Sequence, residues 1–103
     1  MPAPYRIVLA RRAESDLSAV FDYLAHYSPK TAKAMIDKIL RSIELLEGFP
    51  YRNVVSPQPS GAKSAVRSLP IKPYVVFFRI DEEGSTVRIL RVRHGARRPL
   101  RRY

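Results

Sequence analysis

Residues 74–92, YVVFFRIDEEGSTVRILRV, contain the pattern that decides the fold. The first part, 74–80, is apolar on both faces except at Arg79, which is typical of a central strand covered at least in part on both sides. An acidic turn follows, in which Gly84 can adopt the positive φ that a tight reversal needs. Residues 86–92 then return as a second strand. This stretch therefore predicts a β-hairpin.

Two amphipathic helices are predicted before the hairpin. In the first, from about Ala13 to about Tyr27, apolar side chains recur at i, i+3, i+4 and i+7. Ser28 supplies a side-chain cap and Pro29 suits the first position of the second helix, which ends at Gly48. The apolar stripe of this second helix consists of Ala32, Ile36, Ile39, Leu40, Ile43 and Leu46. Because almost nothing separates the helices, we expect an antiparallel helical hairpin.

Two short strands complete the predicted order of elements. In residues 5–9 the side chains of Tyr5, Ile7 and Leu9 fall on one face and positions 7 and 8 are β-branched, which predicts a first strand. Residues 49–64 lose periodicity and gather Pro, Ser and Gly, which indicates an exposed connection. Residues 65–69 form a strand that Pro70 ends. The chain is therefore expected to be α+β, with an N-terminal strand, the helical hairpin, and a three-stranded antiparallel sheet with the helices on one face.

The length and composition limit the classes of protein that fit. A chain of 103 residues corresponds to one domain, residues 1–103, with little room for an enclosed cofactor. There is no Cys and there are only two His, so no metal site or other cofactor is expected. The apolar runs are too short to span a membrane and the N-terminus lacks the apolar core of a secretory signal. We therefore expect a cytoplasmic protein with no membrane partner.

The positive charge is concentrated in the second half of the chain. Residues 1–50 hold seven Lys or Arg and six Asp or Glu, a net charge of +1. Residues 51–103 hold twelve basic and three acidic residues, a net charge of +9, and no acidic residue follows Arg88. This asymmetry predicts a polyanionic partner: nucleic acid, an acidic protein surface or, less favoured, an anionic membrane. The alternative is a solvated basic surface that only aids solubility.

Several common chemistries have no motif in this sequence. The four glycines do not group into a phosphate-binding loop, and neither Gly-x-Ser-x-Gly nor His-Glu-x-x-His occurs. Outside the helices the acidic residues occur only at 81–83, which gives a two-carboxylate nuclease or glycosidase little to build on. Metal-free chemistry remains open.

One cluster of residue types suits metal-free cleavage of RNA. That reaction needs a base for the 2′-hydroxyl, an acid for the leaving oxygen and cations around the phosphorus. His94 or Tyr103 suits the first two roles, and arginines suit the third. The same residues also suit a binding surface without chemistry, and His94 alone suits a hydrogen-bonded strand end. The cluster comprises Arg91, Arg93, His94, Arg97, Arg98, Arg101, Arg102 and Tyr103, with Arg67 and Lys63 across the sheet. His26, on the first helix, is expected to be surface or packing.

The whole chain resembles the RelE/ParE superfamily, the small basic toxins of type II toxin–antitoxin modules, often called plasmid stabilisation proteins. The resemblance rests on the order and spacing of three segments: the first strand leading into Ala13-Glu14-Ser15-Asp16-Leu17, residues 74–80, and the ending VRILRVRHGARRP at 87–99. It implies the fold derived above and growth inhibition by the free toxin. It also implies neutralisation by a cognate antitoxin whose extended segment wraps the toxin.

The superfamily contains two different activities. RelE-like members cut mRNA in the ribosome, using an arginine on the strand that matches 74–80, basic residues on the preceding strand, and an arginine and a tyrosine near the C-terminus. The central arginine position is Tyr74 here, which departs from that pattern. The remaining roles would fall to Arg67, Arg97 and Tyr103, so the resemblance leaves a metal-independent endoribonuclease as the alternative.

ParE-like members bind and poison DNA gyrase without such a catalytic set. An aromatic residue at position 74, the apolar strand after it and the His-x-x-Arg type of ending look more like these members, so gyrase inhibition is our leading hypothesis. A degenerate relative with another target is the third. On either leading hypothesis the residues expected to bind the target are Arg67, Arg91, Arg93, His94, Arg97, Arg98, Arg101 and Arg102. The expected partners are the antitoxin and either gyrase or the ribosome with mRNA.

Overall fold

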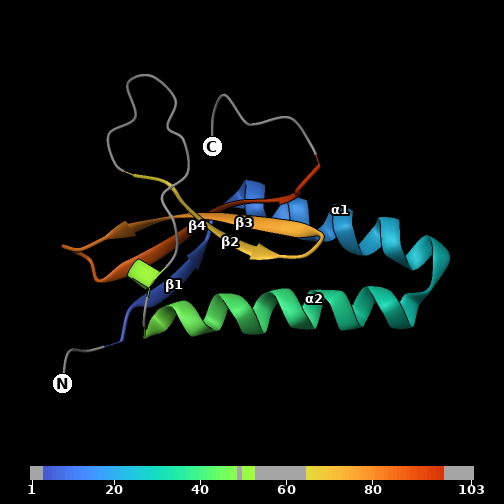
Figure 1. The fold of residues 1–103 in the computed structure, drawn as a ribbon, viewed down its shortest axis with the longest axis horizontal. Coiled ribbons are helices and arrows are strands. Elements are labelled where there is room, and N and C mark those ends of the chain that lie inside the picture. The colour runs from blue at the N-terminus through green and yellow to red at the C-terminus, as the bar shows by residue number, and fades with distance from the viewer. Residues whose placement is uncertain (1–3, 49, 53–64, 97–103) are drawn as a thin grey trace.

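The computed structural model describes residues 4–48, 50–52 and 65–96. The elements in chain order are β1 (Arg6–Leu9), α1 (Arg11–Tyr27), α2 (Pro29–Glu44), β2 (Arg67–Ile71), β3 (Tyr74–Asp81) and β4 (Thr86–His94). Single 3₁₀ turns at Leu45–Glu47 and Pro50–Arg52 follow α2. The predicted order of elements and the α+β class are confirmed (Figure 1).

The four strands form one sheet in the order β1-β4-β3-β2. β3 is antiparallel to both β2 and β4, as predicted, but β1 pairs with β4 in parallel. The predicted three-stranded antiparallel sheet is therefore confirmed, and β1, whose pairing was not predicted, joins it as a fourth, parallel strand. The helical hairpin returns the chain to the end of the sheet where it started, so β2 runs in the direction of β1, and two further reversals leave β4 running that way too.

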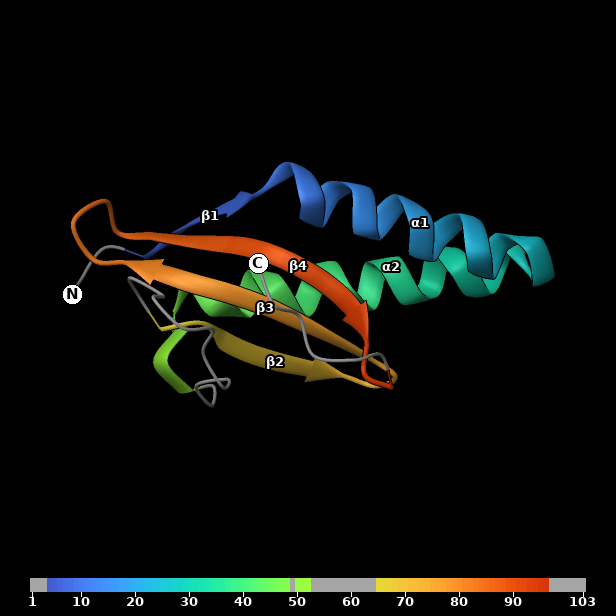
Figure 2. The same cartoon turned by 90° about the horizontal axis from the view of Figure 1, so that it is seen from above.

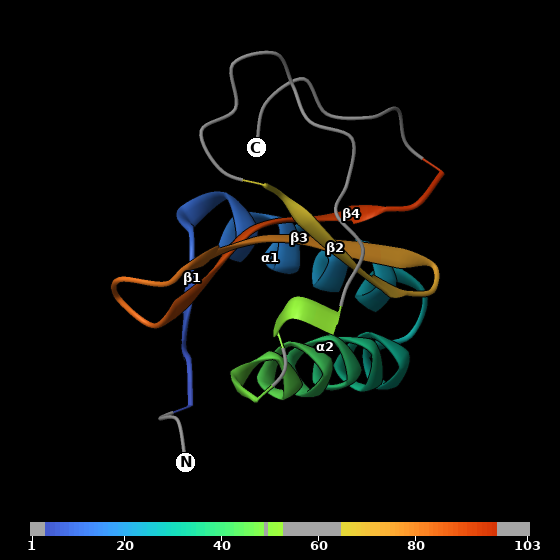
Figure 3. The same cartoon turned by 60° about the vertical axis from the view of Figure 1, so that its left-hand side comes forward.

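The helices cover one face and one edge of this sheet. α2 lies beneath the sheet, whereas α1 continues from β1 and lies beside the last part of β4 (Figures 2 and 3). The main cluster of buried side chains joins both helices to the inner face of the strands. It consists of Ala13, Leu17, Ile39, Ile43, Leu46, Ile71, Tyr74, Val76, Phe78, Val87, Ile89 and Val92.

The helix boundaries follow from local chemistry. The Ser28 hydroxyl accepts the Thr31 N–H at 3.2 Å and Pro29 is the first residue of α2, which confirms the predicted cap. α1 begins at Arg11, two residues earlier than expected, and Leu46 is buried in the 3₁₀ turn after α2 rather than in the helix itself. None of the helices that the model describes is long and apolar enough to cross a membrane.

Two local predictions in the strand region need correction. Pro70 does not end the strand but lies within β2, opposite Val75; this is possible because β2 is an edge strand, so the missing N–H leaves no ladder bond broken. The positive φ of the β3–β4 turn, 46°, is at Ser85 and not at Gly84. A Cβ at Gly84 would lie 3.0 Å from the Asp81 carboxylate, so a larger residue there would require that exposed side chain to shift.

A β-bulge sets which side of the sheet the late arginines occupy. The β3–β4 register shifts between Phe77, which pairs with Arg91, and Phe78, which pairs with Ile89, so Leu90 is the extra residue. Without this shift the alternation of β4 would turn Arg91 into the core. With it, Val92 is buried and the arginines on either side of it leave the apolar face.

Candidate target-binding surface

Arg91 is held by helix α1. Its Nε donates to Asp16 Oδ2 at 2.7 Å and its Nη2 donates to Oδ1 at 3.1 Å, a two-pronged pair in which both side chains are less than one-fifth exposed. The same carboxylate accepts the Val92 N–H at 2.9 Å. The hydrogen bond from Asp16 raises the pKa of Arg91 further above its usual value. Arg91 was predicted as a target-binding residue; here it ties β4 to α1.

Arg93 and His94 lie at the end of β4 and differ in surroundings. Arg93 is half-buried and pairs with Val75 on the face away from the helices. His94 is exposed, and its ring meets the buried Tyr74 edge-to-face at a centroid distance of 5.6 Å. Just beyond, the Gly95 N–H donates to the Pro73 carbonyl at 2.8 Å, which fixes the backbone where the strand ends. Lys72–Pro73, in the β2–β3 turn, is a cis peptide bond.

The hydrogen bonding of His94 restricts its chemistry. Its Nδ1 accepts the Ala96 N–H at 3.1 Å. A neutral imidazole has one donor and one acceptor nitrogen, so with Nδ1 accepting, the proton is on Nε2. In this arrangement the free nitrogen is a donor. It can contact an anionic or carbonyl oxygen, but it is not poised to remove a proton from a hydroxyl.

Arg67 belongs to a separate cluster at the hairpin end of the sheet. Its guanidinium lies over the Tyr51 ring, 4.9 Å from the centroid. The Tyr51 hydroxyl donates to Glu82 Oε1, and the Tyr5 hydroxyl donates to the same oxygen at 2.7 Å. The hydrogen bond to Glu82 raises the pKa of Tyr5 to about 12 and raises that of Tyr51, while the two phenols lower the pKa of Glu82.

The structure does not bring Arg67 and His94 together. Arg67 pairs with Phe78 and His94 pairs with Tyr74, on opposite sides of β3. The register places their Cα atoms about 14 Å apart along the strands and about 10 Å apart across them. The remaining predicted site residues, Lys63, Arg97, Arg98, Arg101, Arg102 and Tyr103, lie outside the described residues.

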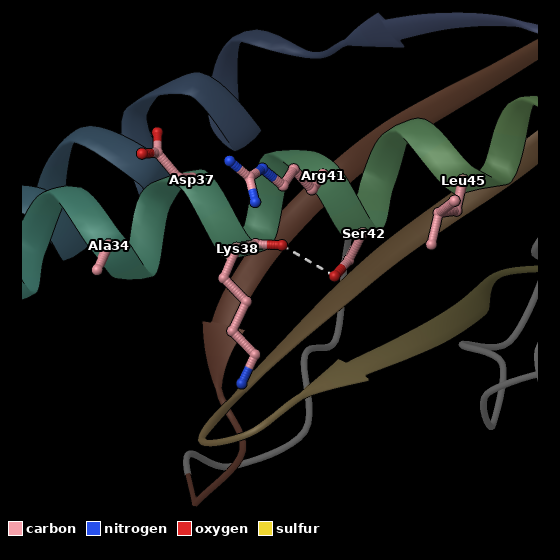
Figure 4. A pocket seen from close by; sticks show the side chains of 6 residues that line it. All are labelled: Ala34, Asp37, Lys38, Arg41, Ser42 and Leu45. Carbon is pink, nitrogen blue, oxygen red and sulfur yellow. Dashed lines mark hydrogen bonds between the residues drawn. The ribbon is translucent and has the colours of Figure 1, made fainter.

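A shallow groove runs along the exposed side of α2 (Figure 4). It is lined by Ala34, Asp37, Lys38, Arg41, Ser42 and Leu45. The Ser42 hydroxyl donates back to the Lys38 carbonyl at 2.9 Å, so it is not set against a base as a nucleophile would be. Within residues 4–48, 50–52 and 65–96, no three His, Cys, Asp or Glu side chains group closely enough to hold a metal ion. His26 is exposed, with its ring against Tyr27.

Two positioning residues were missed from sequence. Asp16 belongs to a segment that carries the family resemblance, but no sequence pattern indicates which arginine it pairs with. Glu82 looked like an ordinary turn residue, whereas its carboxylate joins the turn to Tyr5 and Tyr51. The apolar run at 87, 89, 90 and 92 was the available signal for the bulge, because the spacing changes from two to one and back.

The chain matches known toxins over most of its length. A family model described as the ParE toxin of the type II toxin–antitoxin system, parDE, matches residues 7–99. Toxin RelE2 of Caulobacter vibrioides is 30% identical over 93 residues, which are 89% of this chain and 97% of that protein.

Solved structures give the same result. A chain of the chromosomal ParDE system from P. aeruginosa has a TM-score of 0.68 at 25% identity, covering 87% of this chain and 95% of its own. A chain of the toxin–antitoxin complex RelBE2 from Mycobacterium tuberculosis has a TM-score of 0.59 at 26% identity, covering 94% and 98%. The archaeal RelE–RelB complex from Pyrococcus horikoshii shares the fold at a TM-score of 0.65 and 15% identity, covering 92% and 99%. These matches define a type II toxin. The chain belongs to the RelE/ParE superfamily, and the family model that it matches is that of ParE.

Proposed function

We propose that this toxin inhibits growth by binding DNA gyrase through the basic end of β4 and the arginines that follow it, without cutting nucleic acid. The observation that carries this proposal is the separation of Arg67 from His94. Metal-free cleavage of RNA needs its base, acid and cations around one phosphate. These two candidates lie at opposite ends of the sheet, and each is already engaged by a neighbouring ring.

The position of Tyr74 supports the same choice. The resemblance assigns this position to the central arginine of the ribonuclease members. Here the side chain is only 6% exposed and belongs to the core on the helix side of the sheet, so it offers no cation to a substrate. With Nδ1 of His94 accepting from Ala96, the described residues also lack a base at this end.

Binding to a target needs accessible charged side chains but no set of catalytic groups around one phosphate. The end of β4 supplies such side chains. Arg93 is half-buried on the open side of the sheet, and His94 is exposed beside it. The Gly95–Pro73 hydrogen bond fixes the backbone two residues before Arg97 and three before Arg98. An anionic surface of a protein target would complement this concentration of charge.

A cognate antitoxin is the second proposed partner. The three solved relatives are toxin–antitoxin systems or complexes. We propose that an antitoxin likewise holds this toxin inactive, so that expressing the chain alone arrests growth and co-expressing the antitoxin restores it.

The test compares two activities of the purified chain. Inhibition of DNA supercoiling by gyrase is expected, with no cleavage of messages in a translating extract. The triple variant Arg93→Ala, Arg97→Ala, Arg98→Ala should weaken gyrase inhibition about tenfold or more. The matched control Lys30→Ala, Lys33→Ala, Lys38→Ala, which removes the same charge from α2, should inhibit as the wild type does. Codon-positioned cleavage of mRNA by the wild type would overturn the proposal.

The alternative, a ribosome-dependent endoribonuclease, is favoured by one observation: a relative at 30% identity carries the name Toxin RelE2. Its candidate residues Arg97 and Tyr103 lie outside the described residues. In that case Tyr103→Phe should reduce message cleavage about 100-fold. For a gyrase inhibitor the same change should be nearly silent.

A further inference from the structure

Three arginines outside the proposed target-binding residues share one patch of the sheet. Arg79 on β3 pairs directly with Arg88 on β4. On β1, Arg6 pairs with Thr86, two residues before Arg88, so it lies diagonally next to Arg88. Arg6, Arg79 and Arg88 are called the arginine patch below.

The patch faces away from the helices. Val87 and Ile89, which flank Arg88, are fully buried on the helix side, and successive side chains of a strand alternate between faces. Ile7 pairs with Val87 in the same row of the core, so Arg6 lies on the opposite side. Arg6 and Arg88 are exposed, and Arg79 is half-buried between them and the rest of the sheet.

Among the residues that the structure describes, no Asp or Glu carboxylate forms an ion pair with the patch. All nine Asp and Glu residues fall within the described ranges. Among the residues that the structure describes, the ion pair found is that of Arg91 with Asp16. Asp81 lies on the same face, but its Oδ1 accepts the Gly84 N–H at 3.3 Å and forms no ion pair with the patch. Like charges directly opposite one another in a sheet are unfavourable, so Arg79 and Arg88 repel each other in the free toxin.

Arg79 also holds an unsatisfied donor. Its Nε is buried and has no hydrogen-bond partner. A buried N–H donor without an acceptor lowers the stability of the fold. A negatively charged oxygen that accepted this hydrogen bond would remove that penalty and offset the repulsion between Arg79 and Arg88. Both features therefore point to an acceptor of negative charge supplied from outside the chain.

We propose that the arginine patch binds carboxylates of an acidic and apolar segment of a partner protein, the antitoxin. Guanidinium groups match carboxylates in two-pronged geometry, as Arg91 and Asp16 already do in this molecule. The apolar side chains of Val8, beside Arg88, and Phe77, two residues before Arg79, are half-buried on the same face. Arginine among apolar side chains is typical of protein interfaces, whereas nucleic-acid interfaces are more uniformly basic and polar.

This inference rests on the antitoxin partnership and not on gyrase. It assigns the two binding roles to different parts of the sheet: the antitoxin carboxylates to the hairpin end and the target to the end of β4. Variants of the patch should therefore lose antitoxin-type binding while they keep gyrase inhibition.

The experiment uses the full chain and a short synthetic peptide that alternates glutamate with leucine. The Nε–Hε resonances of the arginines are followed by NMR during titration, and affinity is measured by fluorescence anisotropy. The Arg79 resonance should shift saturably. The double variant Arg79→Gln, Arg88→Gln should bind about tenfold or more weakly. The matched control Lys30→Gln, Lys33→Gln should bind as the wild type does.

Three outcomes would overturn the inference. The first is equal binding of a peptide with glutamine in place of glutamate, and the second is unchanged binding by the double variant. The third is displacement of the peptide from Arg79 by a lower concentration of a single-stranded oligonucleotide, because that result would assign the patch to phosphates. If the double variant fails to fold, the single variant Arg88→Gln replaces it in the binding measurement, because Arg88 is exposed and its substitution should not disturb the core. Gyrase inhibition is measured on the same samples. If the wild type fails to inhibit gyrase while the peptide results hold, the proposed function fails and this inference stands.

Discussion

Two arginines three residues apart on β4 have opposite surroundings. Arg91 lies beside α1, where the Asp16 carboxylate takes both prongs of its guanidinium. Arg88 lies near the hairpin turn, opposite Arg79, where no carboxylate of the described chain pairs with it. The two residues have the same charge, and both lie on the face of β4 away from the helices. Arg91 joins β4 to α1, whereas the exposed Arg88 can contact a partner.

The difference arises from what lies along the open edge of β4. β1 covers that edge only as far as Ile89, whose carbonyl accepts the Ala10 N–H at 2.8 Å. The chain then turns into α1, which brings Asp16 to the next free donor, the Val92 N–H. Beyond the end of β1, the Asp16 side chain thus supplies a hydrogen-bond acceptor to the β4 backbone in place of a strand. The same carboxylate therefore also neutralises Arg91. Arg88, near the hairpin turn, has no such carboxylate partner among the described residues.

Removing the Asp16 contacts between α1 and β4 should have the largest effect on stability. Asp16→Ala removes the acceptor of three hydrogen bonds, two of them from a charged donor, in a half-buried setting. The free energy of unfolding should fall by about 2 kcal/mol. Urea unfolding followed by circular dichroism measures this, with Glu14→Ala on the exposed side of the same helix as the control. A loss no larger than that of the control would show that Asp16 does not anchor β4.

The hairpin end has a carboxylate of its own, Glu82, but phenols satisfy it rather than arginines. Because the pKa of Tyr5 is raised to about 12, its protonated hydroxyl stabilises the fold below the unfolded pKa of 10.0, and this contribution is lost as the pH rises through about 12. The pKa of Glu82 is lowered, so its contribution is present above pH 4.5 and lost as the pH falls below it.

Glu82→Gln should bring the pKa of Tyr5 back toward 10. The measurement is the ultraviolet absorbance of phenolate during an alkaline titration, in which Tyr5 and Tyr51 should titrate late in the wild type and with the other tyrosines in the variant. Glu83→Gln, the neighbouring turn residue, is the control. Identical titration curves for the wild type and Glu82→Gln would contradict the hydrogen-bonded cluster.

The smallest effect is expected at the arginine patch itself, and its sign is opposite. Arg88→Gln removes a like-charge contact with Arg79, so the free toxin should become more stable by about 0.5 kcal/mol. The gain should shrink at high salt, because screening already weakens the repulsion in the wild type. Thermal unfolding at low and high ionic strength measures both. A variant less stable than the wild type at low salt would mean that Arg88 has a favourable partner.

Much of the fold was predictable because it depends on local signals. The Ser28-Pro29 cap, the two helices and the hairpin at 74–92 were all predicted from spacing, and each is confirmed. One member of the first apolar stripe, Phe21, is nevertheless 39% exposed. The errors fall where a neighbour in space decides the outcome. Pro70 is tolerated within β2 because no strand that the structure describes pairs with its other side. The parallel pairing of β1, which was not predicted, depends on the path of the chain through both helices.

The candidate site was less predictable, for the same physical reason. The sequence by itself determined the net charge of +10, its concentration after residue 50, and the apolar positions that bury one face of each strand. Only the tertiary structure decided which arginines retain a free charge, because a guanidinium is neutralised by whichever carboxylate the fold brings within hydrogen-bonding distance. The bulge at Leu90 turned Arg91 out of the core, and α1 then placed Asp16 beside it. The hairpin register set Arg79 opposite Arg88, and no Asp or Glu that the structure describes forms an ion pair with either of them.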